Sequence, residues 1–377
     1  MDFALNDIQQ MLQDSAGKFV QNDYDFETRR KHSESALGYS EDHWALFAEL
    51  GWLALPFEEQ YGGLDGNSVD LMVLMAELGR GLLVEPFLAT VVLGGNLIQR
   101  HGSAAQKETL IPAIIAGELK LAFAGCEAHN NIDITQIKTT ATIDGDSYLL
   151  QGKKSVVVNA ACADKLIVAA RTSGNMGDKG GISLFMVESN AAGVSRRDFV
   201  TNDGGRASDI ELTQVSAVCL GEADSAYAAI QSVHNDALIA LCSEAVALMD
   251  RMLKATAEYT KIRKQFDVPI ATFQVLQHRM VDMFMECEQA RSMLYYGALN
   301  LNSADLNEAI RACRLMKCKI GQSARLVGQT AVQLHGGMGV SDELDVGHIF
   351  KRLTMINSTF GSFDVHLDTL IKQYQAG

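Results

Sequence analysis

Two stretches of this chain combine residue types that can hold an anionic, flat ligand. Residues 263–274, here called the tip, carry an arginine, aromatic rings and amide side chains: Arg263, Gln265, Phe266, Phe273 and Gln274. A guanidinium binds phosphate through parallel hydrogen bonds, and amide groups hydrogen-bond to the polar edges of a ligand. The same residues also suit a solvated helical hairpin with a buried phenylalanine, so the tip alone does not identify a ligand.

The second stretch, residues 333–340, is called the glycine loop. It reads Gln-Leu-His-Gly-Gly-Met-Gly-Val and follows a segment with helical periodicity. Gly336 and Gly337 let the backbone leave a helix with positive φ and come close to another group, and His335 is expected to fix the loop. The loop has neither the Gly-Lys-Ser/Thr ending of a Walker loop nor a G-x-G-x-x-G fingerprint. On its own it fits a helix stop better than a phosphate site.

No sequence pattern predicts a metal site. The nine histidines show no H-x-x-x-H pair and no cluster of histidine with aspartate that suits a metal. The seven cysteines are scattered, odd in number and without a C-x-x-C pair, which favours reduced thiols over zinc ligands or disulfides. We therefore expect the chain to bind no metal.

Three blocks of different periodicity position the tip and the glycine loop. Residues 1–120 place apolar side chains at helical spacing, and residues 121–223 read as short β-rich runs between polar or glycine breaks. The middle block predicts a compact antiparallel β domain, a small barrel or sandwich. From residue 224 to 377 the helical period returns. The predicted fold class is therefore α+β, with a helical domain on each side of a β domain.

The last block contains three long segments with helical periodicity, at residues 226–263, 272–301 and 306–334. Segments of this length predict an antiparallel bundle of long helices. The tip would then join the first two long helices, and the glycine loop would end the third.

Composition and net charge exclude some classes of binding partner. The chain has 377 residues, 47% of them hydrophobic, and a formal net charge of −14. Such a charge argues against nucleic acid or an anionic membrane surface as a partner, because both would repel the chain. The N-terminus lacks the basic and apolar regions of a signal peptide, and the most apolar window, residues 82–98, is too interrupted to span a bilayer. We expect a cytoplasmic protein.

Together and in this order, the two stretches resemble the flavin-binding signatures of the acyl-CoA dehydrogenase family. The matching residues are Arg263-x-Gln265-Phe266, Phe273-Gln274-x-x-Gln277-His278-Arg279 and Gln333-Leu334-His335-Gly336-Gly337-x-Gly339. Residues 56–63 resemble that family's proline-acidic-tyrosine-glycine-glycine loop, and the order helix, sheet, helix is its architecture. The resemblance covers the whole chain. It implies an oxidoreductase of β-oxidation that removes two hydrogens from an acyl-CoA thioester, with FAD as cofactor and electron-transferring flavoprotein as acceptor.

In that family, the matching residues bind the adenine and pyrophosphate half of FAD across a subunit interface. The resemblance assigns this role to one set of residues: Arg263, Gln265, Phe266, Ile270, Phe273, Gln274, Gln333, Gly336 and Gly337.

The side that would hold the flavin ring departs from the family pattern. The family strand that ends in Thr-Glu before Gly-Ser-Asp reads Phe123-Ala124-Gly125-Cys126-Glu127 and then Asn131-Ile132-Asp133, so Cys126 and Ile132 replace a threonine and a serine. A second strand of the family carries a tryptophan, an isoleucine and a threonine, and the matching segment here is Val156-Val157-Val158. Weaker candidates for flavin contacts are Phe123, Cys126, Val158 and Ser362.

The residue at the position of the family's catalytic base also differs. Removal of an α-proton needs a carboxylate beside the substrate, but Phe360 occupies the position of the usual glutamate before Gly361-Ser362. A minority of the family place the base on the first helix of the C-terminal bundle, where this chain offers Asp236. Apolar neighbours raise the pKa of a carboxylate and suit such a base, although an aspartate on a helix face is commonly solvated or a cap.

The chain as a whole resembles the small subunit of pimeloyl-CoA dehydrogenase-type enzymes, which pair with a homologous subunit. This resemblance implies an α₂β₂ heterotetramer in which the chain completes the FAD site of its neighbour. Two alternatives stay open: a self-sufficient homotetramer with Asp236 as base, and a structural homologue without catalysis. Medium-chain, diacid, branched and steroid side-chain thioesters all remain open as substrates, within fatty acid or steroid side-chain catabolism.

Overall fold

The computed structural model describes residues 4–128, 133–301, 303 and 305–376. The chain forms two compact units, each assembled from segments that are distant in sequence. The first unit comprises Met1–Arg30, Ser68–Leu83 and Leu238–Gly377, and the second comprises Lys31–Asn67 and Val84–Ala237. The helix α7 (Tyr227–Ile262) therefore contributes residues to both units.

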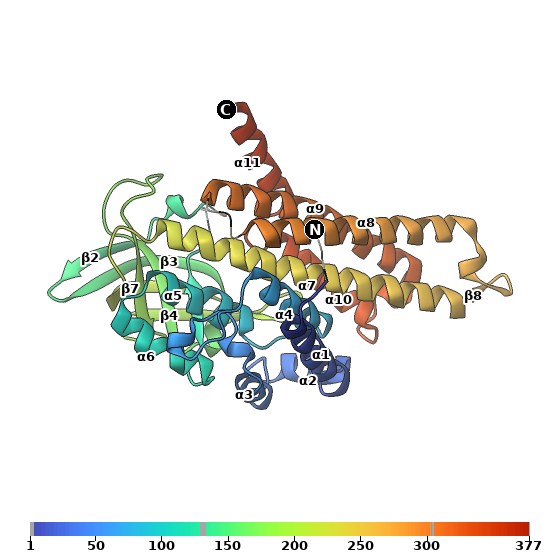
Figure 1. Cartoon of the computed structure of the whole chain (residues 1–377), viewed down its shortest axis with the longest axis horizontal. Coiled ribbons are helices and arrows are strands. Elements are labelled where there is room, and N and C mark those ends of the chain that lie inside the picture. The colour runs from blue at the N-terminus through green and yellow to red at the C-terminus, as the bar shows by residue number, and fades with distance from the viewer. Residues whose placement is uncertain (1–3, 129–132, 302, 304, 377) are drawn as a thin grey trace. The chain divides into compact units, whose positions relative to one another are not determined.

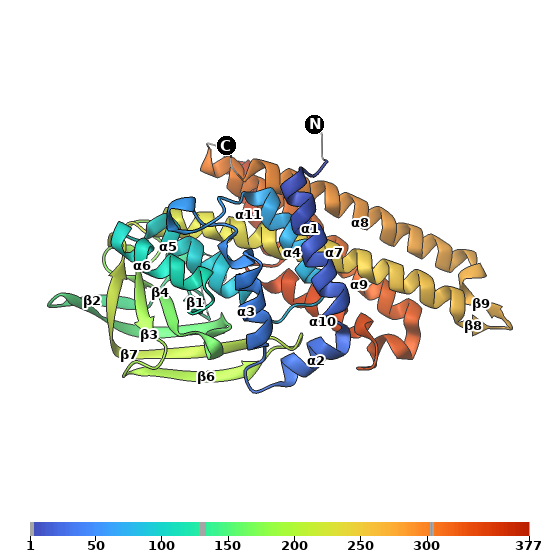
Figure 2. The same cartoon turned by 60° about the horizontal axis from the view of Figure 1, so that its bottom comes forward.

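The first unit is a helical bundle built on three long helices. These are α7, α8 (Gln274–Asn300) and α9 (Leu306–His335), which confirm the three long helices predicted from periodicity. In both views α7 and α8 run alongside each other and meet at the short strands β8 and β9 (Figures 1 and 2). The other helices of the unit are α1 (Asp7–Asn22), α4 (Ser68–Arg80), α10 (Asp345–Ser358) and α11 (Phe363–Ala376).

A stripe of buried apolar residues explains why α9 lies inside the bundle. They recur every three or four positions along one side of the helix: Ala309, Ala312, Met316, Ile320, Ala324, Val327 and Ala331. Burial of such a stripe stabilises a helix by about 25 cal/mol for each Å² of apolar surface removed from water. Of the helices in the described part of the chain, none is long and apolar enough to cross a membrane.

The second unit contains a β sheet that closes on itself. Its strands are β1 (Leu121–Ala124), β2 (Thr140–Asp144), β3 (Ser147–Val158), β4 (Lys165–Arg171), β5 (Ile182–Glu188), β6 (Val194–Val200) and β7 (Arg206–Leu220). The order β4-β2-β3-β7-β5 returns to β4, while β1 pairs with β4 and β6 pairs with β7. Figure 2 shows β6 alongside β7. A small barrel was one of the predicted forms.

The sheet is mostly antiparallel, as predicted, but two of its strand pairs are parallel. Strand β1 pairs in parallel with β4, from Leu121 opposite Lys165 to Ala124 opposite Val168, and β2 meets β4 in parallel at Thr140 and Arg171. All other pairs in this sheet are antiparallel. Parallel pairing joins strands that are not neighbours in sequence, so local residue patterns do not reveal it.

Short helices complete the second unit. They are α3 (Glu41–Glu49), the 3₁₀ turns η1 (Trp52–Ala54) and η2 (Glu59–Tyr61), the π-helix η3 (Leu88–Gly95), α5 (Asn96–His101) and α6 (Ala104–Ile115), while α2 (Phe26–Glu34) has residues in both units. Gly94 lets η3 approach β1, because a Cβ at that position would lie 2.6 Å from the Cβ of Leu121. The π-helix therefore supports the strand that carries Phe123.

Candidate cofactor-binding site

The tip is a small β hairpin between α7 and α8. Strands β8 (Lys264–Gln265) and β9 (Val268–Pro269) flank Phe266 and Asp267, whose φ angles are 54° and 66°. Positive φ at both central residues is the geometry of a type I′ turn, which matches the twist of a two-stranded hairpin. The backbone N–H of Ile270 donates to the carbonyl oxygen of Arg263 at 2.8 Å and closes the base of the hairpin.

The polar side chains of the tip face solvent. Arg263, Gln265 and Gln274 are exposed, and 87% of Phe266 is accessible. The rings of Phe266 and Phe273 meet edge to face at 6.3 Å, and the buried Ile270 anchors the tip. A guanidinium, an uncovered aromatic ring and two amides are thus presented together, a combination that suits a phosphorylated heterocycle.

The glycine loop begins where α9 ends. Gly336 has φ 60° and ψ −139°, and its backbone N–H donates to the carbonyl oxygen of Gln333. The short 3₁₀ helix η7 (Gly336–Val340) follows. Gln333, Gly336 and Gly337 are exposed, and a Cβ built on either of these two glycines would meet no atom within 4 Å. The loop backbone is therefore open to close approach by a ligand.

Tyr259 lies on α7, one helical turn before the tip, and joins that helix to His335 of the glycine loop. Their rings stack with centroids 4.4 Å apart and an interplanar angle of 26°. The Tyr259 hydroxyl donates to the carbonyl oxygen of His335 at 3.2 Å, and Nδ1 of His335 lies 2.8 Å from the carbonyl oxygen of Ala331. The prediction that His335 fixes the loop is confirmed. The contribution of Tyr259, one helical turn before Arg263, was missed.

A buried ion pair holds the segment that carries Cys126. The carboxylate of Glu127 accepts hydrogen bonds from Lys154 Nζ at 2.8 Å, from the hydroxyl and N–H of Thr139, and from the N–H of Lys138. Burial raises the pKa of Glu127, but Lys154 and these hydrogen bonds outweigh it and lower the pKa to about 2. Cys126 itself is exposed, and its carbonyl oxygen accepts from the N–H of Ser155.

The remaining candidates for flavin-ring contacts offer few hydrogen-bond donors. Phe123 is 9% exposed on β1, and the ring of His234 lies 6.1 Å from its own ring. Val158 is half-buried at the end of β3. Ile132, the residue at the family's serine position, lies outside the described residues. The thiol and alkyl groups at Cys126 and Val158 therefore stand where hydroxyl groups would serve a flavin better.

Asp236 is held by two side chains of its own unit. Its Oδ2 lies 2.7 Å from Nη2 of Arg100 and accepts from the amide of Asn96 at 3.0 Å. The residue is only 4% exposed. Burial raises the pKa of Asp236, while Arg100 and Asn96 lower it, and the net shift is upward. A raised pKa suits a base, whereas the arginine competes for the same carboxylate oxygen.

Phe360 lies between α10 and α11. Its backbone is in the left-handed region, with φ 54°. Its carbonyl oxygen lies 2.8 Å from Nε2 of His366, and the hydroxyl of Ser362 accepts from the N–H of Val365 at 3.4 Å. These contacts order the first turn of α11. Phe360 has no proton-accepting side chain, so it cannot replace a catalytic carboxylate.

The structure holds the adenine-side candidates in one unit and leaves most of them accessible, while Ile270 is buried and Phe273 is half-buried. Arg263 to Gln274 and Gln333 to Gly337 belong to one compact unit, linked by Tyr259 and His335. Their exposed guanidinium, aromatic ring, amides and open glycine backbone fit the adenine and pyrophosphate of FAD. The ring-side candidates Phe123, Cys126 and Val158 belong to the other unit and fit a flavin less well.

Comparison with known proteins gives the same family along the full chain. The N-terminal, middle and C-terminal domain models of acyl-CoA dehydrogenases match residues 6–118, 122–218 and 227–375. The probable acyl-CoA dehydrogenase YngJ of Bacillus subtilis (strain 168) is 27% identical over 383 residues, which cover 99% of each chain.

Two solved structures extend this likeness to three dimensions. The Tcur3481-Tcur3483 steroid ACAD is 28% identical with a TM-score of 0.88, covering 98% of this chain and 99% of that one. PigA with FAD and proline is 25% identical with a TM-score of 0.90, covering 100% and 99%. The predicted order of helices, sheet and helices is confirmed, and this chain belongs to the acyl-CoA dehydrogenase family of oxidoreductases.

Proposed function

We propose that this chain is one subunit of an FAD-dependent acyl-CoA dehydrogenase that works as an α₂β₂ tetramer with a homologous subunit. In this assembly the tip and the glycine loop bind the adenine and pyrophosphate half of an FAD whose ring lies in the neighbouring subunit. The observation that carries the proposal is the exposed tip and glycine loop, locked together by Tyr259 and His335, in a chain with Phe360 at the usual base position.

Each adenine-side residue has a role that follows from its chemistry. Arg263 would neutralise the pyrophosphate, and the N–H group of Gly337 would donate to one of its oxygens. Phe266 and Phe273 would cover the adenine ring, while Gln265, Gln274 and Gln333 would hydrogen-bond to its edge or to the ribose. FAD bound there would accept the hydride, which carries both of the electrons that are removed from the acyl thioester.

An exposed apolar face on α8 supports a subunit partner. Five of its exposed apolar side chains fall on one side of the helix at helical spacing: Val281, Phe284, Met285, Tyr296 and Leu299. Between 42% and 54% of each is accessible. Glu288 and Ser292 lie between them on the same side, and exposed apolar side chains gathered in this way mark an interaction surface. We assign it to the homologous subunit, and the name Tcur3481-Tcur3483 of a similar structure likewise joins two components.

The substrate class is an acyl-CoA thioester of fatty acid or steroid side-chain catabolism, and the acceptor of the electrons is an electron-transferring flavoprotein. The catalytic carboxylate and the ring-binding hydroxyl groups come from the partner subunit, because this chain carries Phe360, Cys126 and Val158 at the corresponding positions.

Co-expression with a homologous subunit tests the proposal. We expect the purified complex to contain half as many flavins as polypeptide chains and to reduce flavin with acyl-CoA, whereas the chain purified alone should hold no stoichiometric flavin. Yellow, catalytically active protein from this chain alone would refute the division of labour. A complex that lacks flavin absorbance would instead identify a structural homologue without catalysis.

A self-sufficient homotetramer is the second candidate, because Asp236 is buried and its pKa is raised. In that case Asp236 is the base, and its substitution should stop the reduction of bound FAD by substrate. The ion pair with Arg100 counts against this role.

We also propose domain boundaries at residues 1–120, 121–223 and 224–377. The three matched family segments lie inside these ranges, which supports them. Limited proteolysis should cut first near residues 121 and 223, and preferential cleavage inside the α7–α9 bundle would contradict the boundaries.

A further inference from the structure

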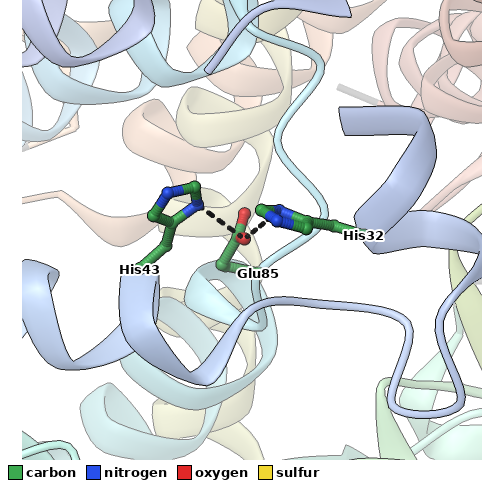
Figure 3. Close-up of side chains that lie close together, drawn as sticks. All are labelled: His32, His43 and Glu85. Carbon is green, nitrogen blue, oxygen red and sulfur yellow. Dashed lines mark ion pairs between the residues drawn. The ribbon is translucent and has the colours of Figure 1, made fainter. Parts of the chain in front are cut away.

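His32, His43 and Glu85 form a cluster of potential metal ligands away from the cofactor-binding residues in sequence. His32 lies on α2, His43 on α3, and Glu85 in the segment between α4 and η3. All three belong to the same compact unit. Figure 3 shows both imidazole rings turned toward one carboxylate oxygen of Glu85.

The distances suit ligands that share a cation. Nδ1 of His32 and Nδ1 of His43 each lie 3.8 Å from Oε1 of Glu85, and the three donor atoms all lie within 4.8 Å of one another. A separation of 3.8 Å exceeds the usual hydrogen-bond length. Ligand atoms at about 2.0–2.1 Å from one Zn²⁺ lie roughly 3.4 Å apart in tetrahedral geometry. Each nitrogen–oxygen separation would therefore shorten by about 0.4 Å, and the separation of the two nitrogens, which is at most 4.8 Å, by no more than about 1.4 Å.

Burial and donor type point to the same class of ligand. The Glu85 side chain has no accessible surface, and the two histidine side chains are 16% and 17% accessible. The N–H of Ser40 donates to Oε1 of Glu85 at 3.4 Å, and a bound cation would add positive charge beside the same buried carboxylate. Two imidazole nitrogens with one carboxylate favour zinc or a similar divalent transition metal over Mg²⁺ or Ca²⁺, which prefer oxygen ligands.

We propose that His32, His43 and Glu85 bind one Zn²⁺, with the fourth position open to water. The partial exposure of both histidines gives the ion access from solvent. The ion ties α2 and α3 to the segment that precedes the π-helix η3. Its ligands are distinct from every residue assigned to FAD or substrate, so the ion acts apart from the flavin chemistry. Zinc binding therefore stabilises the second unit independently of flavin.

Metal titration of the full chain tests the site. The chain is stripped with a chelator and titrated with ZnCl₂ by calorimetry, and retained zinc is counted by mass spectrometry after dialysis. We expect one Zn²⁺ per chain, a higher Tm with zinc, and X-ray absorption showing nitrogen and oxygen ligands at about 2.0–2.1 Å. Substoichiometric zinc after dialysis, or sulfur ligands at about 2.3 Å from the exposed Cys126, would overturn the proposal.

Substitutions identify the ligands. Glu85→Gln and His43→Gln should each weaken zinc binding at least about 100-fold and remove the zinc-dependent rise in Tm, because even outer-sphere partners contribute 10–100-fold to metal affinity. His278→Gln, at an exposed position on α8, is the matched control and should bind zinc like the parent chain. Circular dichroism establishes that each variant is folded. Unchanged zinc affinity in either folded ligand variant would rule out this site.

Discussion

Glu127 shows how one buried carboxylate fixes a strand end that carries a candidate flavin contact. It is 5% exposed and adjoins Cys126, and it gathers donors from Lys154, Thr139 and Lys138. Lys154 is 1% exposed, so each charge of the pair relies on the other. Removal of one partner therefore leaves an uncompensated charge in the barrel.

For Glu127→Gln we expect a loss of about 3–5 kcal/mol in the free energy of unfolding, the range for breaking one side of a buried ion pair. The double variant Glu127→Gln/Lys154→Met removes both charges and should lose less than the single variant. Urea denaturation at neutral pH measures both. A single variant as stable as the parent chain would show that the pair is not a stabilising element.

The same carboxylate gives a pH dependence with a defined sign. The pKa of Glu127 is about 2 in the folded chain against an ordinary 4.5, so its stabilising contribution is present above pH 4.5 and is lost as the pH falls through 2. The contribution amounts to about 3 kcal/mol. The parent chain should therefore lose more stability between pH 5 and about pH 2 than the double variant does. Parallel acid-stability curves would contradict the lowered pKa.

The rate of flavin reduction tests whether Asp236 is the catalytic base. If it only balances Arg100, Asp236→Asn should leave the rate of flavin reduction in the assembled enzyme within about twofold, whereas loss of a general base costs about 10²–10⁴-fold. Asp250→Asn is the matched control, because Asp250 also lies on α7 and pairs with an arginine, Arg291, at 2.8 Å. Stopped-flow absorbance measures the rate. We expect both variants to react like the parent, and a selective loss in Asp236→Asn would establish the self-sufficient enzyme.

At the scale of elements, the glycine loop contains two adjacent glycines with different constraints. Gly336 has φ 60°, so Gly336→Ala strains the backbone and should cost about 1–3 kcal/mol. Gly337 is outside the positive-φ region, and a Cβ there would meet nothing within 4 Å, so Gly337→Ala should leave the Tm of the chain unchanged. If the loop touches pyrophosphate, Gly337→Ala should still reduce the FAD content of the assembled tetramer. Full FAD occupancy with Gly337→Ala would remove the loop from the proposed site.

The long helices were predictable because their apolar period persists over many turns. The tip and the glycine loop were also found from sequence, since arginine, aromatic residues and paired glycines leave a local pattern. The type I′ turn at Phe266 and Asp267 was not predicted, because neither residue is the asparagine or glycine that usually marks positive φ. The parallel pairing of β1 with β4 was missed because it depends on tertiary contacts.

Clusters of side chains that come from distant segments were also missed. His32, His43 and Glu85 have no metal-binding spacing, and the sequence led to the expectation of no metal site. The partners of Asp236 are equally hidden, because Asn96 and Arg100 lie on α5, far from α7 in sequence. In each case the fold brings the side chains together, and their spacing in the sequence does not reveal the cluster.

At the scale of the assembly, the apolar face of α8 gives a prediction about subunit association. Phe284 is 54% exposed in the single chain, and a charge placed there would be costly in a dry interface. Phe284→Glu should prevent formation of the tetramer with the homologous subunit and leave the fold of the chain intact. Light scattering after size exclusion measures the mass. Ile143→Glu, at a position 76% exposed on β2, is the control and should assemble normally. A Phe284→Glu complex of unchanged mass would place the partner elsewhere.

The stack of Tyr259 on His335 has a consequence for the evolution of this sequence. Because one ring contact and one hydrogen bond tie the tip to the glycine loop, a substitution in either motif alters the support of the other. Selection on cofactor binding would then act on the two motifs as one heritable unit. Among descendants of this chain, loss of the aromatic ring at position 259 should accompany replacement of His335, even though 75 residues of sequence separate them.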